Sequence, residues 1–130
     1  MSQGVALLFL SLVLFEVKHF VCDFVLQTGY QYRNKGRYGH PGGIVHAGLH
    51  TIASLPAVLL MIKTPDLIAA IAAAEFLVHY HTDWLKEQIN EHRKLTQSET
   101  LYWVVFGADQ LIHQMTYVVI LAVLARANQL

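Results

Sequence analysis

Four long runs of apolar residues alternate with shorter polar stretches along this chain. The runs cover about residues 4–27, 44–62, 66–86 and 100–126. Each run is close to the roughly 20 helical residues that cross about 30 Å of hydrocarbon. The pattern therefore predicts an all-α fold, a bundle of four transmembrane helices, with residues 1–130 forming a single integral membrane domain.

Composition supports a membrane location and argues against other classes of protein. The chain is 55% hydrophobic and only 14% charged, whereas soluble domains are about 45–50% apolar and about 25% charged. A soluble four-helix bundle is the alternative, but the first and fourth runs lack a polar stripe wide enough to face water. The formal net charge of zero gives no reason to expect nucleic-acid binding. Cys22 is the single cysteine, so no disulfide framework is expected.

The first apolar run could also be the core of a secretory signal peptide, at residues 5–15. However, its apolar character continues to Leu26, no basic segment precedes it and no small-residue cleavage site is evident. We therefore expect this run to be retained as the first membrane-spanning helix.

Basic residues are distributed unevenly among the connections. The tight turn at 63–66 holds only Lys63, and the C-terminal end holds only Arg126. The long connections at 28–43 and 87–98 hold Arg33, Lys35, Arg37, Arg93 and Lys94. Since cytoplasmic loops carry an excess of Lys and Arg, we expect both long loops in the cytoplasm and both termini outside.

Each apolar run carries one pair of potential metal ligands spaced i, i+4. Side chains four residues apart lie on one face of a helix, one turn apart. At about 1.5 Å per residue, most of these groups fall in the cytoplasmic half of the bundle. Four helices could therefore direct eight ligands toward a common axis: His19, Asp23, His46, His50, His79, Asp83, Asp109 and His113.

The spacing of these pairs also suggests an internal repeat. Asp23 and Asp83 lie 60 residues apart, as do His19 and His79. His46 and Asp109 lie 63 residues apart, as do His50 and His113. This favours two pseudo-repeated helical hairpins related by an axis along the membrane normal.

Metal binding explains such a cluster better than its alternatives. Carboxylates buried in hydrocarbon must be paired, protonated or metal-bound, and inward-facing His and carboxylate ligands on four helices are typical of di-metal proteins. We therefore expect a divalent metal cofactor, two ions rather than one, with Zn first and Fe or Mn as alternatives. There are three other interpretations: one ion with an outer shell of hydrogen-bonded ligands, a metal-free His–Asp network for proton transfer, and bis-His haem ligation. Haem ligation leaves the three aspartates unexplained.

Further polar residues lie near the predicted site. Gln27 and Gln110 could orient a ligand or substrate, or simply be polar residues at helix ends. Lys35 and Lys86 flank the cytoplasmic mouth, where they could bind an anionic phosphate or merely follow the positive-inside rule.

Three charged residues inside the apolar runs also need an explanation. Glu75, one turn before His79, could be a further ligand, a general base or a partner of that imidazole. Glu16 and Lys18 are expected to pair with other helices or to extend toward the membrane surface.

The succession of motifs resembles a known family. "HFVCDFVLQ", Asn34-Lys35, "HAGLH", "HYHTDWLK" and "DQLIH" are similar to motifs of the small bacterial membrane proteins catalogued as domain of unknown function 3307. The resemblance runs from about His19 to His113 and implies a bacterial inner-membrane location. It implies these motif positions: His19, Asp23, Gln27, Lys35, His46, His50, His79, Asp83, Lys86, Asp109, Gln110 and His113. The His/Asp pattern is also similar to that of membrane-bound metal-dependent hydrolases.

These observations favour a metal-dependent hydrolase that acts on a lipid or a lipid-linked phosphate or ester at the cytoplasmic leaflet. A two-metal His/Asp site can activate water and polarise a phosphoryl or carbonyl oxygen. Glu75 or a spare aspartate such as Asp109 would serve as the base. The expected partners are membrane lipid and an amphiphilic substrate. The alternatives are a di-iron lipid oxidase or desaturase, and a non-enzymatic protein with a transporting or structural metal site.

Overall fold

The computed structural model describes residues 2–129, and it is helical throughout apart from the connections. Among these residues there is no β-strand, which confirms the all-α prediction. The elements are α1 (Gln3–Phe20), the π-helical turn η1 (Val21–Val25), α2 (Gly29–Asn34), α3 (Pro41–Met61), α4 (Pro65–Arg93) and α5 (Thr100–Ala127).

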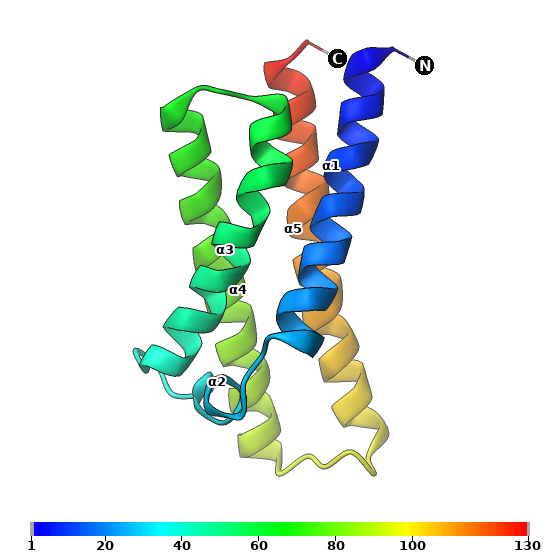
Figure 1. Ribbon diagram of the computed structural model, residues 1–130. Coiled ribbons are helices and arrows are strands. Elements are labelled where there is room, and N and C mark those ends of the chain that lie inside the picture. Colours follow the sequence, from blue (N-terminus) through cyan, green and yellow to red (C-terminus); the bar gives the residue numbers. More distant parts are fainter. Residues whose placement is uncertain (1, 130) are drawn as a thin grey trace.

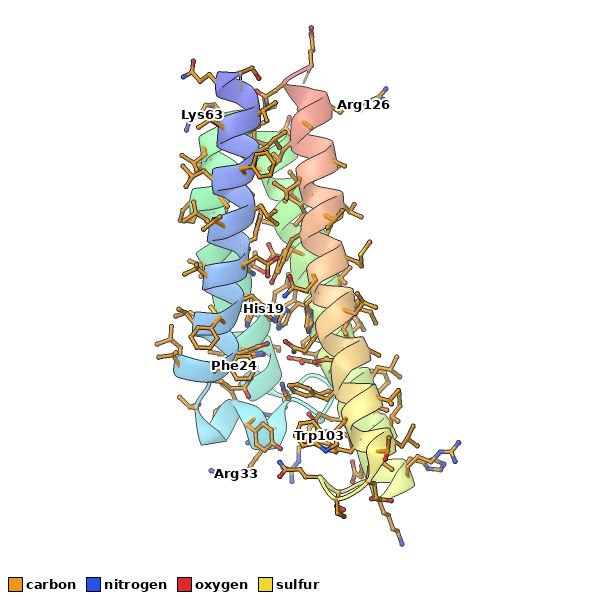
Figure 2. All side chains as sticks on the ribbon, turned by 90° about the vertical axis from the view of Figure 1, so that its right-hand side faces the viewer. His19, Phe24, Arg33, Lys63, Trp103 and Arg126 are labelled. Atoms are coloured by element: carbon orange, nitrogen blue, oxygen red, sulfur yellow. The ribbon has the colours of Figure 1, made fainter. Side chains whose placement is uncertain are left out.

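The four long helices α1, α3, α4 and α5 lie side by side as an antiparallel bundle (Figure 1). Each of α1 and α4 contacts both α3 and α5. The two chain ends and the α3–α4 turn lie at one end of the bundle, and α2 and the α4–α5 connection lie at the other (Figure 1). Lys63 and Arg126 therefore lie far from Arg33 (Figure 2).

The main differences between the helix boundaries and the predicted runs concern α2 and the end of α4. The 28–43 connection was expected to be a loop, but it contains α2, which a capping box between Thr28 and Gln31 starts. The third run was expected to end at residue 86, but α4 continues to Arg93 and ends where Lys94 adopts φ 53°. Good helix formers such as Glu and Gln extend this helix beyond its apolar part.

The bundle interior has an apolar half and a polar half. The apolar half lies toward the chain termini, where Phe15 stacks on Tyr117 with ring centroids 5.0 Å apart. Its other buried members are Ala57, Val58, Met61, Ile62, Ile71, Ile120 and Leu124. The polar half lies toward α2 and contains buried histidine, aspartate and lysine side chains. This division places the titratable residues in one part of the bundle.

Three of the long helices are long and apolar enough to cross a membrane. They are Gln3–Val25, which combines α1 and η1, Pro41–Met61 and Thr100–Ala127. The predicted fourth span, 66–86 in α4, is not among them. The reason is that α4 carries a stripe of charged and titratable residues, and that stripe is buried: Glu75, His79, Asp83 and Lys86 are at most 7% exposed.

Candidate metal centre

All eight predicted ligands lie in the polar half of the bundle interior. They come from α1, η1, α3, α4 and α5, and seven are buried while Asp23 is partly buried. His19 lies in the interior between α1 and α5, toward the α2 end (Figure 2). The i, i+4 spacing therefore does direct these side chains inward, as the sequence pattern predicts.

A first group of potential ligands consists of Asp23, His46, His50 and His79. One ligand atom of each lies within 4.8 Å of the others. The Asp23 Oδ1 atom is 3.0 Å from His50 Nε2 and 3.2 Å from His46 Nε2. Three imidazoles and one carboxylate form a set of four ligands of the kind that tetrahedral zinc takes.

A second group consists of His79, Asp83 and His113, whose ligand atoms also lie within 4.8 Å of one another. Asp109 adjoins this group, because its Oδ1 atom is 3.5 Å from His113 Nε2. His79 belongs to both groups, and Asp83 Oδ2 lies 3.1 Å from His46 Nε2 of the first group. The two groups are therefore neighbours in one continuous cluster.

Several buried atoms of the second group have no hydrogen-bond partner among the described residues. They are His79 Nε2, Asp83 Oδ2, Asp109 Oδ1 and His113 Nε2. His79 Nε2 lies 3.5 Å from Asp83 Oδ2, yet the two atoms do not form a hydrogen bond. Since buried polar atoms are almost always paired, converging unpaired nitrogen and carboxylate atoms fit a bound cation. The residues present are thus suited to hold a metal ion.

His19 lies outside both groups, although it was predicted as a ligand. Its Nε2 atom is 3.0 Å from Gln110 Oε1 and 3.2 Å from Asp23 Oδ2, and its Nδ1 atom is 3.0 Å from the hydroxyl of Tyr117. Tyr117 is not among the residues that the sequence pattern predicts. Its position one turn after His113 on the same helix face was the available signal.

Both glutamines contact predicted ligands. Gln27 Nε2 is 3.2 Å from His46 Nε2. Gln110 donates from Nε2 to Asp109 Oδ2 at 3.1 Å and also contacts His19. Both glutamines thus contact side chains of predicted ligands.

Lys35 and Lys86 are buried against the aspartates, at 4% and 7% exposure. Lys35 Nζ donates to Asp83 Oδ1 at 3.2 Å, and Lys86 Nζ donates to Asp109 Oδ2 at 3.4 Å and to Asp83 Oδ1 at 3.5 Å. Basic residues that only follow the positive-inside rule would lie at the water-exposed surface. These two ammonium groups instead neutralise part of the charge of two aspartates, Asp83 and Asp109.

A polar cavity of about 190 Å³ leads to the cluster from the α2 end. Its lining includes the predicted residues Asp23, Gln27, Lys35, Lys86 and Gln110, together with Phe24, Tyr32, Glu87, Tyr102 and Phe106. The sequence analysis missed the two tyrosines, which carry no distinguishing local motif. Partial burial, with Tyr102 and Glu87 nearby, raises the pKa of the Tyr32 phenol. This phenol therefore stays protonated near neutral pH and can donate a hydrogen bond.

Glu75 lies on the side of the cluster away from this cavity. Its Oε1 atom accepts hydrogen bonds from Lys18 Nζ at 2.7 Å and from Ser54 Oγ at 2.6 Å. Lys18 also donates to the backbone carbonyl of His50 at 3.3 Å. Glu75 thus belongs to neither ligand group and connects to the cluster through Lys18. Lys18 pairs with another helix, which is one of the two roles expected for it; the other was extension toward the membrane surface.

Comparison with known proteins identifies a family but no characterised relative. A family model described as "Protein of unknown function (DUF3307)" matches residues 9–130. That range contains every residue of both ligand groups and of the polar cavity. No curated protein matches the chain, and no solved structure matches it.

Proposed function

The chain belongs to the family described as Protein of unknown function (DUF3307), and from the site that it carries we propose that it is a membrane-embedded metal-dependent hydrolase. The substrate is a phosphate or ester of a lipid at the cytoplasmic leaflet. The observation that carries this proposal is the pair of adjoining His/Asp groups beneath a cavity lined by two buried lysines.

The outward face of α4 supports a fourth membrane span. Its polar stripe faces the interior, whereas Leu77, Val78 and Leu85 point outward at 53%, 38% and 51% exposure. A helix of a membrane bundle can carry charged groups where they face the protein interior. Four spans with the basic α2 and α4–α5 connections in the cytoplasm then place both termini outside.

The two ligand groups would hold two divalent ions, with zinc the first candidate and iron or manganese the alternatives. Asp23, His46 and His50 would hold one ion, Asp83 and His113 the other, and His79 lies within reach of both. When bound, such a pair polarises a phosphoryl or carbonyl oxygen as a Lewis acid.

The residues around the groups have separate roles in this proposal. Lys35 and Lys86 bind the anionic oxygens of the substrate, since ammonium groups already bonded to carboxylates can turn to a phosphate in the adjoining cavity. Gln110 and Lys86 both hold Asp109 Oδ2, which leaves Asp109 Oδ1 as the unpaired acceptor. A water oxygen attacks the phosphorus or carbonyl carbon while Asp109 Oδ1 accepts the proton of that water. The ester bond to the leaving oxygen breaks, and Asp109 returns the proton to that oxygen, which leaves as an alcohol.

The contacts of Glu75 favour a positioning role over a catalytic one. Its Oε1 atom is bonded to Lys18 and Ser54, and Lys18 in turn holds the backbone of His50. We therefore assign the base to Asp109, and we assign to Glu75 the orientation of Lys18 and, through it, of the His50 segment.

The cavity argues against a purely structural metal site. A metal that only locks a bundle needs no route to solvent, whereas this cavity reaches Asp23 of the first group and both lysines. Open access with polar lining is what a catalytic site requires.

Elemental analysis of the protein, purified in mild detergent without chelators, tests the metal site. We expect divalent metal in the wild type and much less in His50→Ala and Asp83→Ala. Matched controls are His92→Ala and Asp66→Ala, which remove the same side chains at exposed positions and should retain the wild-type content. Equal trace metal in all five proteins would refute the site.

An activity assay tests the reaction. Hexadecyl phosphate and a hexadecyl carboxylic ester serve as probes, and release of phosphate or acid is measured in the metal-loaded protein. We expect hydrolysis of at least one probe and its loss in Asp109→Asn. A metal-loaded protein that hydrolyses neither probe, or an iron protein that consumes oxygen with a lipid, would contradict a hydrolase and favour binding or oxidation.

A further inference from the structure

A continuous apolar groove follows the outer seam between α4 and α5. Its larger part is a hollow of about 420 Å³ lined by Ala74, Glu75, Val78, Leu111, Ile112, Met115, Thr116, Val119 and Ile120. Its smaller part is a hollow of about 110 Å³ lined by Thr82, Leu85, Lys86, Ile89, Val105, Ala108, Asp109 and Ile112. The two parts share Ile112, and Lys86 also lines the polar cavity above the metal centre. The groove therefore runs from the site into the apolar half of the bundle.

The lining of the larger part presents hydrocarbon to its surroundings. Glu75 and Thr116 are the two lining residues with polar side chains. Thr116 donates to the carbonyl of Ile112, and Glu75 accepts from Lys18 and Ser54 through Oε1, while its Oε2 atom is buried without a partner among the described residues. Along the α5 edge Leu111, Met115 and Val119 are 61%, 49% and 59% exposed. The groove is thus open to the lipid side of the helices.

The part of the groove between the metal centre and the apolar half matches one leaflet of a bilayer in length. On α5 the lining begins one turn before the site, at Val105. From Asp109, which contacts Lys86, to Val119 the lining covers ten residues, which corresponds to about 15 Å of helix. This is half of a hydrocarbon core of about 30 Å. A lipid chain that starts at the cytoplasmic surface would therefore fit along it without crossing the midplane.

Two lysines lie where the groove passes the polar cavity, together with the carboxylates that they pair with. Lys86 lies where the groove meets the polar cavity, and Lys35 lines that cavity beside it. Both ammonium groups are buried and paired with aspartates, and a phosphate in the cavity offers them additional acceptors. An apolar groove that passes Lys86, with Lys35 in the adjoining cavity, complements an amphiphile with one hydrocarbon chain and an anionic head group.

We propose that the α4–α5 groove binds the hydrocarbon chain of a single-chain lipid phosphate whose head group lies between Lys35 and Lys86. That the bound lipid is the substrate rests on the proposed function. Binding of the lipid in the groove does not depend on hydrolysis. This inference identifies the substrate class as lipid monophosphates with one long chain, and it assigns their selection to residues of α4 and α5 outside the metal centre.

Photolabelling tests where the chain lies. The probe is hexadecyl phosphate with a diazirine at mid-chain, added to the full-length protein in nanodiscs, and labelled residues are mapped by mass spectrometry. We expect label within 111–120 of α5 and 74–78 of α4. Excess hexadecyl phosphate should remove it, and excess inorganic phosphate or hexadecanol should not. Label spread evenly over the lipid-facing surfaces of all four long helices would overturn the groove.

Two variants fill the groove from its exposed side. Ala74→Trp and Ala108→Trp place a large side chain in each part, and both alanines are exposed. We expect each to weaken hexadecyl phosphate binding about tenfold, because several methylene groups lose their apolar contacts. Ala73→Trp, at an exposed position that does not line the groove, is the matched control and should bind as the wild type does. Unchanged affinity in both groove variants would overturn the proposal.

The same measurements separate this inference from the proposed function. The groove would be established and the hydrolase refuted if the groove is labelled, Ala74→Trp abolishes this label, and the protein hydrolyses no probe. Hydrolysis of hexadecyl phosphate at the wild-type rate and KM in both groove variants would support the hydrolase and refute the groove.

Discussion

At the scale of single residues, Asp83 has more charged and titratable neighbours than its predicted role as a ligand alone requires. Its two oxygens lie within 3.5 Å of Lys35, Lys86, His46 and His79, and its side chain is only 6% exposed. It therefore has two sets of neighbours, since its Oδ1 atom accepts from two buried ammonium groups while its Oδ2 atom faces the imidazoles of His46 and His79.

Asp83→Asn tests the contribution of these contacts. The amide keeps the shape of the side chain but leaves Lys35 and Lys86 without one carboxylate, and removing one partner of a buried ion pair costs about 3–5 kcal/mol. We expect thermal unfolding in detergent with EDTA to occur at a clearly lower temperature than in the wild type, and metal content to fall. Asp66→Asn, at an exposed position in the first turn of α4, should change neither. A variant as stable as the wild type would show that these contacts contribute little.

Lys86→Gln separates substrate binding from metal binding. Loss of a charge-assisted hydrogen bond, worth about 1.5–3 kcal/mol, should raise KM for hexadecyl phosphate about tenfold to a hundredfold. Metal content should be retained, because Asp109 and Asp83 lose a competing cation. Steady-state kinetics and elemental analysis measure the two effects, with the exposed Lys63→Gln as control. If metal is lost together with activity, Lys86 holds the site together rather than binding the substrate.

Residue spacing predicts which face of a helix a ligand occupies, but not its partner. All eight predicted ligands lie in the interior, because i, i+4 pairs share a face. The pattern did not predict that His19 contacts Gln110 and Tyr117, or that Glu75 pairs with Lys18. Such partners depend on the relative height and rotation of helices distant in sequence, which local spacing does not encode.

At the scale of elements, the π-helical turn η1 ends the first long helix and carries Asp23. The backbone N–H of Leu26 donates to the carbonyl of Val21 at 2.8 Å, which is an i to i+5 bond. Such turns often occur at functional sites. The sequence analysis predicted an uninterrupted helix to residue 27, because apolar periodicity does not distinguish a π-turn from an α-helix.

The fourth long helix is the element where composition and geometry disagree. Average hydropathy does not identify α4 as a membrane span, yet its polar side chains are buried and its outward residues are largely apolar. A window average cannot separate the two faces of a helix. The apolar faces of α1, α3 and α5 could be predicted from their apolar runs. To predict whether α4 spans the membrane, one must know which stripe of its side chains faces the other helices.

Cysteine labelling in intact cells tests whether α4 crosses the membrane. Thr64→Cys and Ser98→Cys, both at exposed positions on either side of α4, are made in a Cys22→Ala background. If α4 spans, a membrane-impermeant maleimide should label residue 64 from outside, and residue 98 only after the cells are permeabilised. The Cys22→Ala protein alone should remain unlabelled. Labelling of both positions from the same side would exclude a fourth span.

At the scale of the whole molecule, the two hairpins contribute corresponding but unequal ligands. Asp23 and His50 of the first hairpin correspond to Asp83 and His113 of the second at the offsets of 60 and 63 residues, and each pair lies in its own ligand group. Two correspondences remain: His19 matches His79, and His46 matches Asp109, an imidazole in one half and a carboxylate in the other. The first group thus holds three imidazoles and one carboxylate, whereas the second holds two imidazoles and one carboxylate with Asp109 beside it. Of the two groups, only the second contacts Lys35 and Lys86 directly.

This asymmetry predicts how metal stoichiometry responds to single substitutions. His50 belongs only to the first group, His113 only to the second, and His79 to both. We expect His50→Ala and His113→Ala each to lose one of two ions, and His79→Ala to lose most of both, because a ligand shared by adjacent sites supports each of them. Counting ions per chain by elemental analysis, with protein quantified by amino-acid analysis, measures this, and His92→Ala is the control. Identical complete loss in all three variants would instead indicate one ion, with the remaining histidines and aspartates acting as its hydrogen-bonded surroundings.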